Sequence, residues 1–280
     1  MNAEKEWTIS PAKSLFHTKL INLYPYRYLL CKLIQREIRS QYRQTILGPI
    51  WFLLQPILST AVFVFSFGKV AGLSTDGIPQ PLFYFSGLIL WSHFTECLSK
   101  TANIFKDNIP LFSKIFFPRV LIPMATIAML LLRFLIQLCL LTIFMFIYHY
   151  GGHPIQPRIA LLLVPLLLTM ATSLGLGLGL VISAVTVKFR DFSFLMAFAI
   201  QLLLYTSAVI CPLSAVPGKW IVLLRLNPMA NVIEAFRYAC LGSGGCPVAS
   251  LFYSGVFSIT LLLSGLILFK KAQQNFVENH

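Results

Sequence analysis

Long apolar segments recur along this chain of 280 residues, each long enough to match the core of a lipid bilayer. A membrane-crossing helix needs about 20 mostly apolar residues, and turn-forming residues separate the segments here. Hydrophobic residues make up 57% of the chain and charged residues 11%, with a mean hydropathy of +0.78. This composition excludes an ordinary soluble globule and predicts an all-α integral membrane protein.

The spacing of the apolar segments predicts six transmembrane helices in a single membrane domain that covers residues 1–280. The expected spans are residues 50–69, 81–102, 119–149, 158–187, 193–211 and 250–269. Between the last two spans, residues 212–249 hold two short apolar pieces broken by prolines and glycines. We expect them to form a re-entrant hairpin on the outer side, because such pieces are too short to cross a bilayer.

The basic residues are distributed unevenly between the two sides of this topology. With the N-terminus inside, the inner segments hold sixteen lysines and arginines and the outer segments five. This bias follows the positive-inside rule and places both termini, including a tail over residues 1–25, in the cytoplasm. The same distribution gives no reason to expect a nucleic-acid partner, although the net charge is +13.

Residues 26–47 have the pattern of a basic amphipathic helix that lies along the inner membrane surface. Apolar side chains recur every four positions, and basic side chains occupy the other face. The apolar set is Leu30, Ile34, Ile38 and Tyr42, and the basic set is Lys32, Arg36, Arg39 and Arg43. The helix is either an anchor on anionic lipid or a site where Arg36, Arg39 and Arg43 meet a phosphorylated headgroup that enters from the inner leaflet.

The segment around the start of the first span carries a more specific pattern. Arg36-Glu37-Ile38-Arg39 and Tyr42-Arg43 are followed by Leu47-Gly48-Pro49-Ile50-Trp51 and then by Pro56. Together these residues resemble the membrane subunit of the ABC-2 polysaccharide exporters. Gln41 and Pro49 depart from the usual family pattern, which bears on the subfamily and not on the family.

The resemblance implies a homodimer that pairs with two copies of a separate ATPase and exports a polyprenyl-pyrophosphate-linked polysaccharide across the bacterial inner membrane. It implies O-antigen as the cargo, with capsular polysaccharide, teichoic acid or a small molecule as alternatives. ATP and Mg²⁺ would bind the partner ATPase, and this chain would need no cofactor or metal. The two Gly-Lys pairs lack the hydroxyl residue that a phosphate-binding loop requires, since Val70 and Trp220 follow them.

Two inner segments are candidates for contact with that ATPase. Residues 103–118 are bounded by prolines and mix apolar with basic side chains, and the family resemblance implies a short docking helix there. The expected contact residues are Ile109, Leu111, Phe112, Ile115 and Phe116. Arg190 and Asp191 form the other inner turn, where the alternative is an ion pair at a helix end.

Aromatic residues make up 14% of the chain and provide candidates for a glycan conduit. Most aromatic rings in a membrane protein lie at the interfaces, but sugar C–H faces also stack on rings. The candidates are Trp51, Phe52, Phe83, Tyr84, Phe85 and Trp91.

Charged residues within or near the membrane provide a second set of candidates, because such groups are costly in lipid. Glu96 and Arg133 lie within predicted spans, where they could pair with each other. Asn227, Pro228 and Glu234 lie in the outer hairpin and are candidates for an outer gate.

Two other functional classes find little support in the sequence. A membrane glycosyltransferase or phosphatase usually needs clustered carboxylates, whereas Asp76, Asp107 and Asp191 are isolated from one another. An ion-coupled carrier usually has several intramembrane acids and inverted repeats, and neither pattern is present. We therefore expect no catalytic residue and a role in transport.

Overall fold

The computed structural model describes residues 26–42, 50–104, 121–152, 159–186, 191–242, 244–245 and 248–278. Within these residues the chain is helical and contains no strand. The α-helices are α1 (Arg27–Tyr42), α2 (Trp51–Phe63), α3 (Gln80–Ala102), α6 (Leu121–Tyr150), α7 (Val164–Thr186), α8 (Phe192–Tyr205), α9 (Gly218–Leu226), α10 (Pro228–Leu241) and α11 (Val248–Glu278). A π-helix, η4 (Val64–Val70), continues α2, and 3₁₀ turns η5 (Ile159–Leu163) and η6 (Leu213–Ala215) precede α7 and α9.

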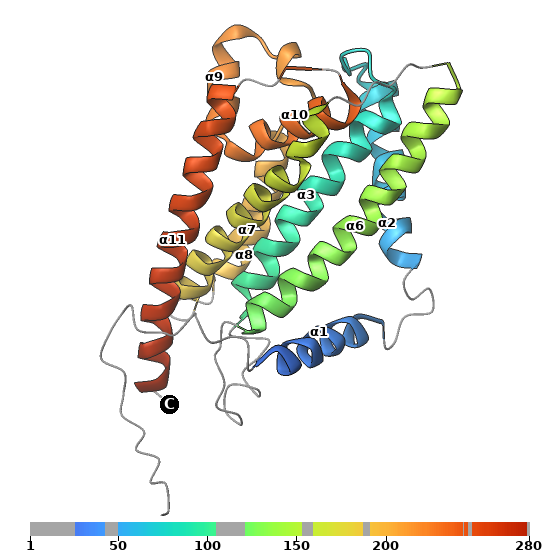
Figure 1. Cartoon of the computed structure of the whole chain (residues 1–280). Helices are drawn as coiled ribbons and strands as arrows, with labels where there is room; N and C mark the ends of the chain where they lie inside the picture. Colours follow the sequence, from blue (N-terminus) through green and yellow to red (C-terminus); the bar gives the residue numbers. More distant parts are fainter. Residues whose placement is uncertain are drawn as a thin grey trace, which may run out of the picture.

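The long helices run side by side, and α1, α9 and α10 lie at the two ends of the bundle (Figure 1). Helix α1 lies across one end, where the C-terminal part of α11 also arrives, and we call this the α1 end. Helices α9 and α10 lie at the opposite end, which we call the α10 end. The central helix is α3, which packs against α2, α6, α7 and α10.

Four helices are long and apolar enough to cross a membrane, which makes this a multi-pass membrane protein. They are Trp51–Val70, Leu121–Tyr150, Ala160–Thr186 and Val248–Lys271. Each coincides with one of the six predicted spans, and the other two predicted spans correspond to α3 and α8.

Helix α3 has the length of a span but a more polar composition, and its burial explains the difference. Of its 23 residues 16 are buried, so neighbouring helices cover it and lipid need not. Polar side chains find partners inside the bundle: the ring nitrogen Nε2 of His93 lies 2.8 Å from the Oγ1 of Thr172 on α7.

Helix α8 is shorter than predicted, so the expected span over 193–211 is wrong at its C-terminal end. The helix ends at Tyr205 after 14 residues, and Ala208 has a φ of 48°, in the left-handed region. Ala208, Val209 and Ile210 extend the apolar sequence beyond Thr206 and Ser207, so composition alone does not fix the break. A helix of this length spans about 21 Å, less than the ~30 Å core of a bilayer.

Glycines allow α7 to approach its two neighbours closely. A Cβ at Gly175 would lie 2.7 Å from the backbone oxygen of Phe94 on α3, and one at Gly179 would lie 2.8 Å from that of Leu98. Gly177 faces the other way, and its backbone oxygen would lie 2.7 Å from a Cβ at Gly265 on α11. Helix α7 therefore fills the space between α3 and α11.

The amphipathic character of α1 matches its position. Leu33 is buried against Leu121 and Ala125 at the start of α6, and Leu29, Leu30 and Ile34 pack around this contact. Residues 43–47, the predicted end of this helix, lie outside the described residues.

Candidate functional site

Arg133 of α6 joins three helices near the α1 end of the bundle, and we call this group the Arg133 junction. Its Nη1 forms an ion pair with Oε1 of Glu96 on α3 at 2.5 Å, so the pairing that the sequence left open is made. Its Nη2 donates a hydrogen bond to Oε1 of Gln55 on α2 at 2.9 Å. The guanidinium carbon also lies 4.8 Å from the ring centroid of Phe52 on α2.

The junction is largely enclosed by protein. Arg133 is 9% exposed, and the Nε of Arg133 and the Nε2 of Gln137 are buried with no hydrogen-bond partner among the described residues. A charge in such a place persists only if other groups compensate it, and here Glu96 and Gln55 do so.

A second ion pair connects the junction to α1. The Nζ of Lys100 on α3 lies 3.5 Å from Oε1 of Glu37 on α1. Because Lys100 follows Glu96 by four residues, the two lie on the same face of α3. The pair is partly exposed, so it positions α1 more than it stabilises the fold.

The predicted headgroup arginines and ATPase contacts are only partly described. Arg36 and Arg39 are exposed on α1, at the α1 end of the molecule. Arg43, Ile109, Leu111, Phe112, Ile115, Phe116 and Arg190 lie outside the described residues. Asp191 is exposed at the start of α8, where its backbone oxygen accepts hydrogen bonds from the amides of Phe194 and Leu195. A carboxylate there is favoured by the helix dipole.

At the α10 end, Asn227 and Pro228 build the start of α10. The Oδ1 of Asn227 accepts a hydrogen bond from the amide of Met229 at 3.0 Å, and Pro228 occupies the first helical position. The Nδ2 of Asn227 also donates to the backbone oxygen of Thr206 at 3.1 Å, just beyond α8. The Asn-Pro pair therefore fixes both the start of α10 and its position against α8.

Arg237 of α10 is the most deeply buried charged side chain described, at 2% exposed, and sequence reasoning gave it no role. Its Nη1 and Nη2 donate hydrogen bonds to the backbone oxygens of Ala208 and Val209 at 2.5 and 3.0 Å. Its guanidinium carbon lies 3.6 Å from the ring centroid of Phe83 on α3. Its burial could have been suspected from its spacing, because Ala230, Glu234 and Arg237 lie four and three residues apart and so share one face of α10.

These contacts explain the early end of α8. The turn after α8 turns two carbonyl oxygens toward α10, and the guanidinium of Arg237 satisfies both. Gly87 leaves room for this side chain, because a Cβ there would lie 2.5 Å from Nη2. Burial lowers the pKa of Arg237 to about 10 against the opposing effect of Glu234, so the guanidinium remains charged at neutral pH.

Glu234 lies one helical turn before Arg237 and is 5% exposed. Burial raises the pKa of its carboxyl above the ordinary range, and the charge of Arg237 opposes this shift. Its Oε2 has no hydrogen-bond partner among the described residues. The carboxyl of Glu234 therefore lies near the charge of Arg237 while its hydrogen-bonding capacity is only partly used.

The family pattern described as ABC-2 type transporter matches residues 28–241. This chain belongs to the ABC-2 transporter family. The match begins in the first turn of α1 and ends with the last residue of α10. Both helix α1 and helix α10, which contains Arg237, therefore lie within the family domain.

Named relatives resemble the ABC-2 chain over nearly its whole length. The O-antigen export system permease protein RfbA of Myxococcus xanthus is 28% identical over 261 residues, which cover 92% of this chain and 97% of the relative. RfbA of Klebsiella pneumoniae is 24% identical, with 89% and 94% covered. The polysialic acid transport protein KpsM of Escherichia coli is 26% identical, with 86% and 92% covered.

Most of the predicted conduit aromatics of the ABC-2 chain are packed inside the subunit. Phe83, Tyr84 and Phe85 are at most 1% exposed, and Phe52 and Trp91 are also buried. Trp51 is 47% exposed at the start of α2. In this conformation only Trp51 of this set is open to a transported chain, and the other five rings pack between helices.

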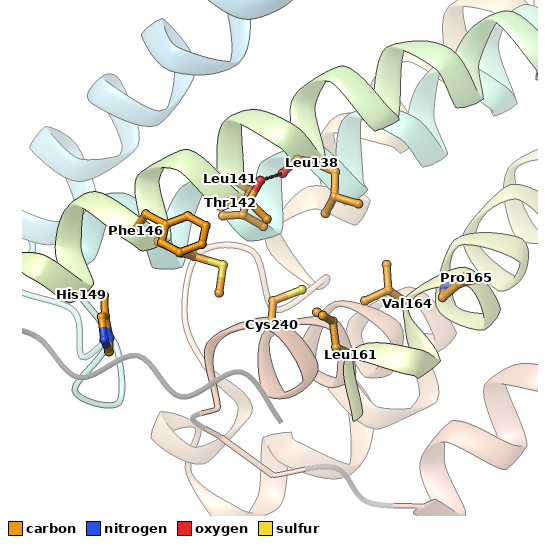
Figure 2. Close-up of a pocket in the computed structure, with 10 residues that line it drawn as sticks. Leu138, Leu141, Thr142, Phe146, His149, Leu161, Val164, Pro165 and Cys240 are labelled. Carbon is orange, nitrogen blue, oxygen red and sulfur yellow. Dashed lines mark hydrogen bonds between the residues drawn. The ribbon is translucent and has the colours of Figure 1, made fainter. Parts of the chain in front are cut away.

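Between α6 and the start of α7 the ABC-2 chain has an apolar groove of about 580 Å³ (Figure 2). One wall is a stripe along α6 from Leu138 to His149, and the other includes Leu161 and Val164. Cys240 of α10 also lines it. None of the described lining residues is a lysine, arginine or carboxylate, so the groove suits hydrocarbon and not sugar.

Within the described part of the ABC-2 chain, no three His, Cys, Asp or Glu residues gather as metal ligands. Cys211 and Cys240 on the α10 side are free thiols, and Cys246 lies outside the described residues. The polar groups that come together are instead the Arg133 junction and the contacts of Arg237, which join helices.

Proposed function

We propose that this chain is the permease subunit of an ATP-driven exporter of a lipid-linked polysaccharide, with O-antigen as the preferred cargo. The observation that carries the proposal is the nearly full-length likeness to the O-antigen export permeases of two bacteria. The polysialic acid transport relative supports the wider class of polysaccharide. Capsular polysaccharide, teichoic acid or a small molecule is the alternative cargo.

The test is transport by the purified chain in vesicles together with its ATPase, combined with deletion of its gene. We expect ATP-dependent movement of a lipid-linked glycan across the vesicle membrane. We also expect loss of surface O-antigen in the deletion strain and its return on complementation. Normal surface polysaccharide in that strain, with no glycan movement in vesicles, would rule out the proposal.

The proposed topology has six crossings in the bacterial inner membrane and both termini in the cytoplasm. The α1 end would face the cytoplasm, because most basic residues belong to segments assigned there. Helices α3 and α8 would make the other two crossings. Helix α3 is long enough to cross but is more polar than the other spans, and α8 is apolar but too short to cross alone. Helices α9 and α10 would form the re-entrant hairpin on the outer side.

A homodimer is the proposed assembly. Helix α8 supports it, because Met196 is its only buried residue and its apolar side chains otherwise face outward. The helix is also too short to cross a bilayer unaided. A second copy alongside α8 would cover these side chains and the irregular backbone that follows them.

Two copies of an ATPase subunit would bind at the α1 end and hydrolyse ATP with Mg²⁺. The proposed docking segment is residues 103–118, with Arg190 and Asp191 as a second contact. This segment connects α3 to α6, and the Glu96–Arg133 ion pair joins the same two helices. Movement of the docked segment would then shift α3 and α6 together and move α2 through Gln55.

Arg36, Arg39 and Arg43 are the proposed contacts for the pyrophosphate of a polyprenyl-linked cargo. Their guanidinium groups suit phosphate oxygens, and α1 lies at the end of the molecule where such a lipid would enter. Replacing all three by alanine should lower export while leaving the chain in the membrane. Export at the normal rate in the triple variant would contradict this role.

The aromatic side chains and the hairpin are proposed to act on the glycan later in its path. Trp51 is the first candidate for stacking on sugar rings, and Phe52, Phe83, Tyr84, Phe85 and Trp91 would take part only if the helices separate. Asn227, Pro228 and Glu234 would form part of an outer gate. The test compares the export rates of Trp51→Ala and Phe83→Ala at equal amounts of protein in the membrane. An exposed ring that stacks on sugar should lower the export rate when it is removed, whereas a packed ring should mainly affect stability.

A further inference from the structure

A groove of about 360 Å³ follows the first span toward the α10 end. One side includes Ile57 and Ala61 of α2 and Phe65 of η4, and Phe144 of α6 also lines the groove. The lining is almost entirely apolar, but Lys69 closes one end. The groove in Figure 2 is larger but has no such cation among its described lining residues.

The π-helix η4 carries Lys69 at the end of the first span. Ile57, Ala61, Phe65 and Lys69 follow one another at intervals of four residues and all line the groove, the spacing of residues that share one helix face. In η4 the backbone hydrogen bonds join residues five apart, and Val64 and Lys69 both line the groove. Gly68 instead turns inward beneath Gln80, whose Nε2 donates to its backbone oxygen at 3.3 Å. Such π-turns are rare and often occur at functional sites.

Lys69 is exposed and forms no ion pair with any residue in the described ranges. The acid nearest in sequence is Asp76, whose Oδ2 accepts a hydrogen bond from the Oγ of Ser214 at 2.6 Å. An ammonium group at the end of an apolar groove, at one end of a spanning helix, matches a lipid whose headgroup is anionic.

We propose that this groove binds one acyl chain of an anionic membrane phospholipid, with the lipid phosphate at Lys69. From Ile57 to Lys69 the helix rises about 18 Å, close to the ~15 Å thickness of one leaflet core. The groove is therefore long enough for most of one acyl chain.

Other occupants fit the groove less well. A polyprenyl pyrophosphate would bring several negative charges to a single ammonium group and a chain longer than the groove. A second copy of this chain would enclose Lys69 in an interface, whereas the cores of protein interfaces are depleted in lysine. A phospholipid leaves its headgroup, and hence Lys69, at the aqueous surface.

The test is native mass spectrometry of the full-length chain with equal amounts of phosphatidylglycerol and phosphatidylcholine that carry the same acyl chains. We expect phosphatidylglycerol to be retained about five-fold more than phosphatidylcholine, since one lysine near the surface contributes on that scale. Lys69→Gln should remove the preference, and Lys69→Arg should keep it. The matched control is Lys219→Gln, which changes an exposed lysine on α9 outside the groove.

The measured quantity is the ratio of phosphatidylglycerol to phosphatidylcholine bound by the folded protein in one sample. A variant that is partly unfolded binds less of both lipids, and this ratio does not change. Ala61→Phe should lower retention of both lipids, because the added ring fills the groove. An unchanged preference in Lys69→Gln, or unchanged retention in Ala61→Phe, would overturn the proposal. Displacement of phosphatidylglycerol by an equal amount of polyprenyl pyrophosphate would also overturn it. So would a Phe65→Cys variant that crosslinks to a second copy beyond the level of the parent chain.

Discussion

Glu96 and Arg133 belong to different spans and meet through an ion pair of 2.5 Å inside the helix bundle. Glu96→Gln should destabilise the chain by about 3 kcal/mol, because it leaves a buried guanidinium without its counter-charge. Thermal unfolding of the purified protein in detergent measures the change. The double variant Glu96→Gln/Arg133→Met should recover most of the loss, and a double variant less stable than Glu96→Gln would contradict the pairing.

Replacement of Arg237 should have a comparable effect at the other end of the molecule. Arg237→Met leaves the backbone oxygens of Ala208 and Val209 without donors and should cost about 3 kcal/mol. Arg237→Lys should be intermediate, since one ammonium cannot reproduce the guanidinium fork. Arg225→Met changes an exposed arginine on α9 and is the control. Equal unfolding temperatures for Arg237→Met and Arg225→Met would refute the role.

Glu234 should make stability depend on pH. Because its pKa is raised in the folded state, the folded protein binds this proton more tightly than the unfolded chain. The stability due to this proton is present below the unfolded pKa of about 4.3 and is lost as pH rises through the folded pKa. Glu234→Gln should therefore gain stability relative to wild type as pH increases. The measurement is the unfolding temperature of both proteins across the pH range. The prediction would be contradicted if Glu234→Gln lost stability relative to wild type as the pH increased.

Asn227 has two separable roles that three variants can distinguish. Asn227→Ala should cost about 1 kcal/mol for the lost helix cap, with a further loss for the contact to Thr206. Asn227→Asp retains the acceptor for the amide of Met229 but not the donor to Thr206, so its stability should be intermediate. Asn227→Ser, which also caps well, should resemble Asn227→Asp. If Asn227→Ala were as stable as Asn227→Asp, the hydrogen bond from the amide of Met229 would contribute nothing to stability.

The close approach of α7 and α3 should make Gly179 sensitive to small additions. A Cβ there would lie 2.8 Å from the backbone oxygen of Leu98, and backbone cannot move aside easily. Gly179→Ala should destabilise the chain by about 1–3 kcal/mol. Gly218→Ala is the control, because nothing lies within 4 Å of the added Cβ. Similar unfolding temperatures for the two variants would argue against tight packing.

Several features follow from local sequence and needed no tertiary information. The apolar runs predicted where the helices lie, because hydrophobicity and helix period are properties of neighbouring residues. The alternation of basic and apolar residues likewise predicted α1 and its surface position.

Other features depend on contacts between distant segments and emerge only in the folded chain. The end of α8 at Tyr205 is one, because the carbonyls that follow it are satisfied by a guanidinium from α10. The burial of Phe83 and Tyr84 is another, because a central helix and a lipid-facing helix can have the same aromatic content.

Sequence alone thus determined that this is a helical membrane protein with a basic amphipathic helix, since local patterns encode these properties, and the motifs around the first span resemble those of the ABC-2 polysaccharide exporters. Tertiary structure decided which charges meet and which aromatic rings are covered. The physical reason is that a buried charge or a packed ring is defined by its partners, and those partners lie tens of residues away in the chain.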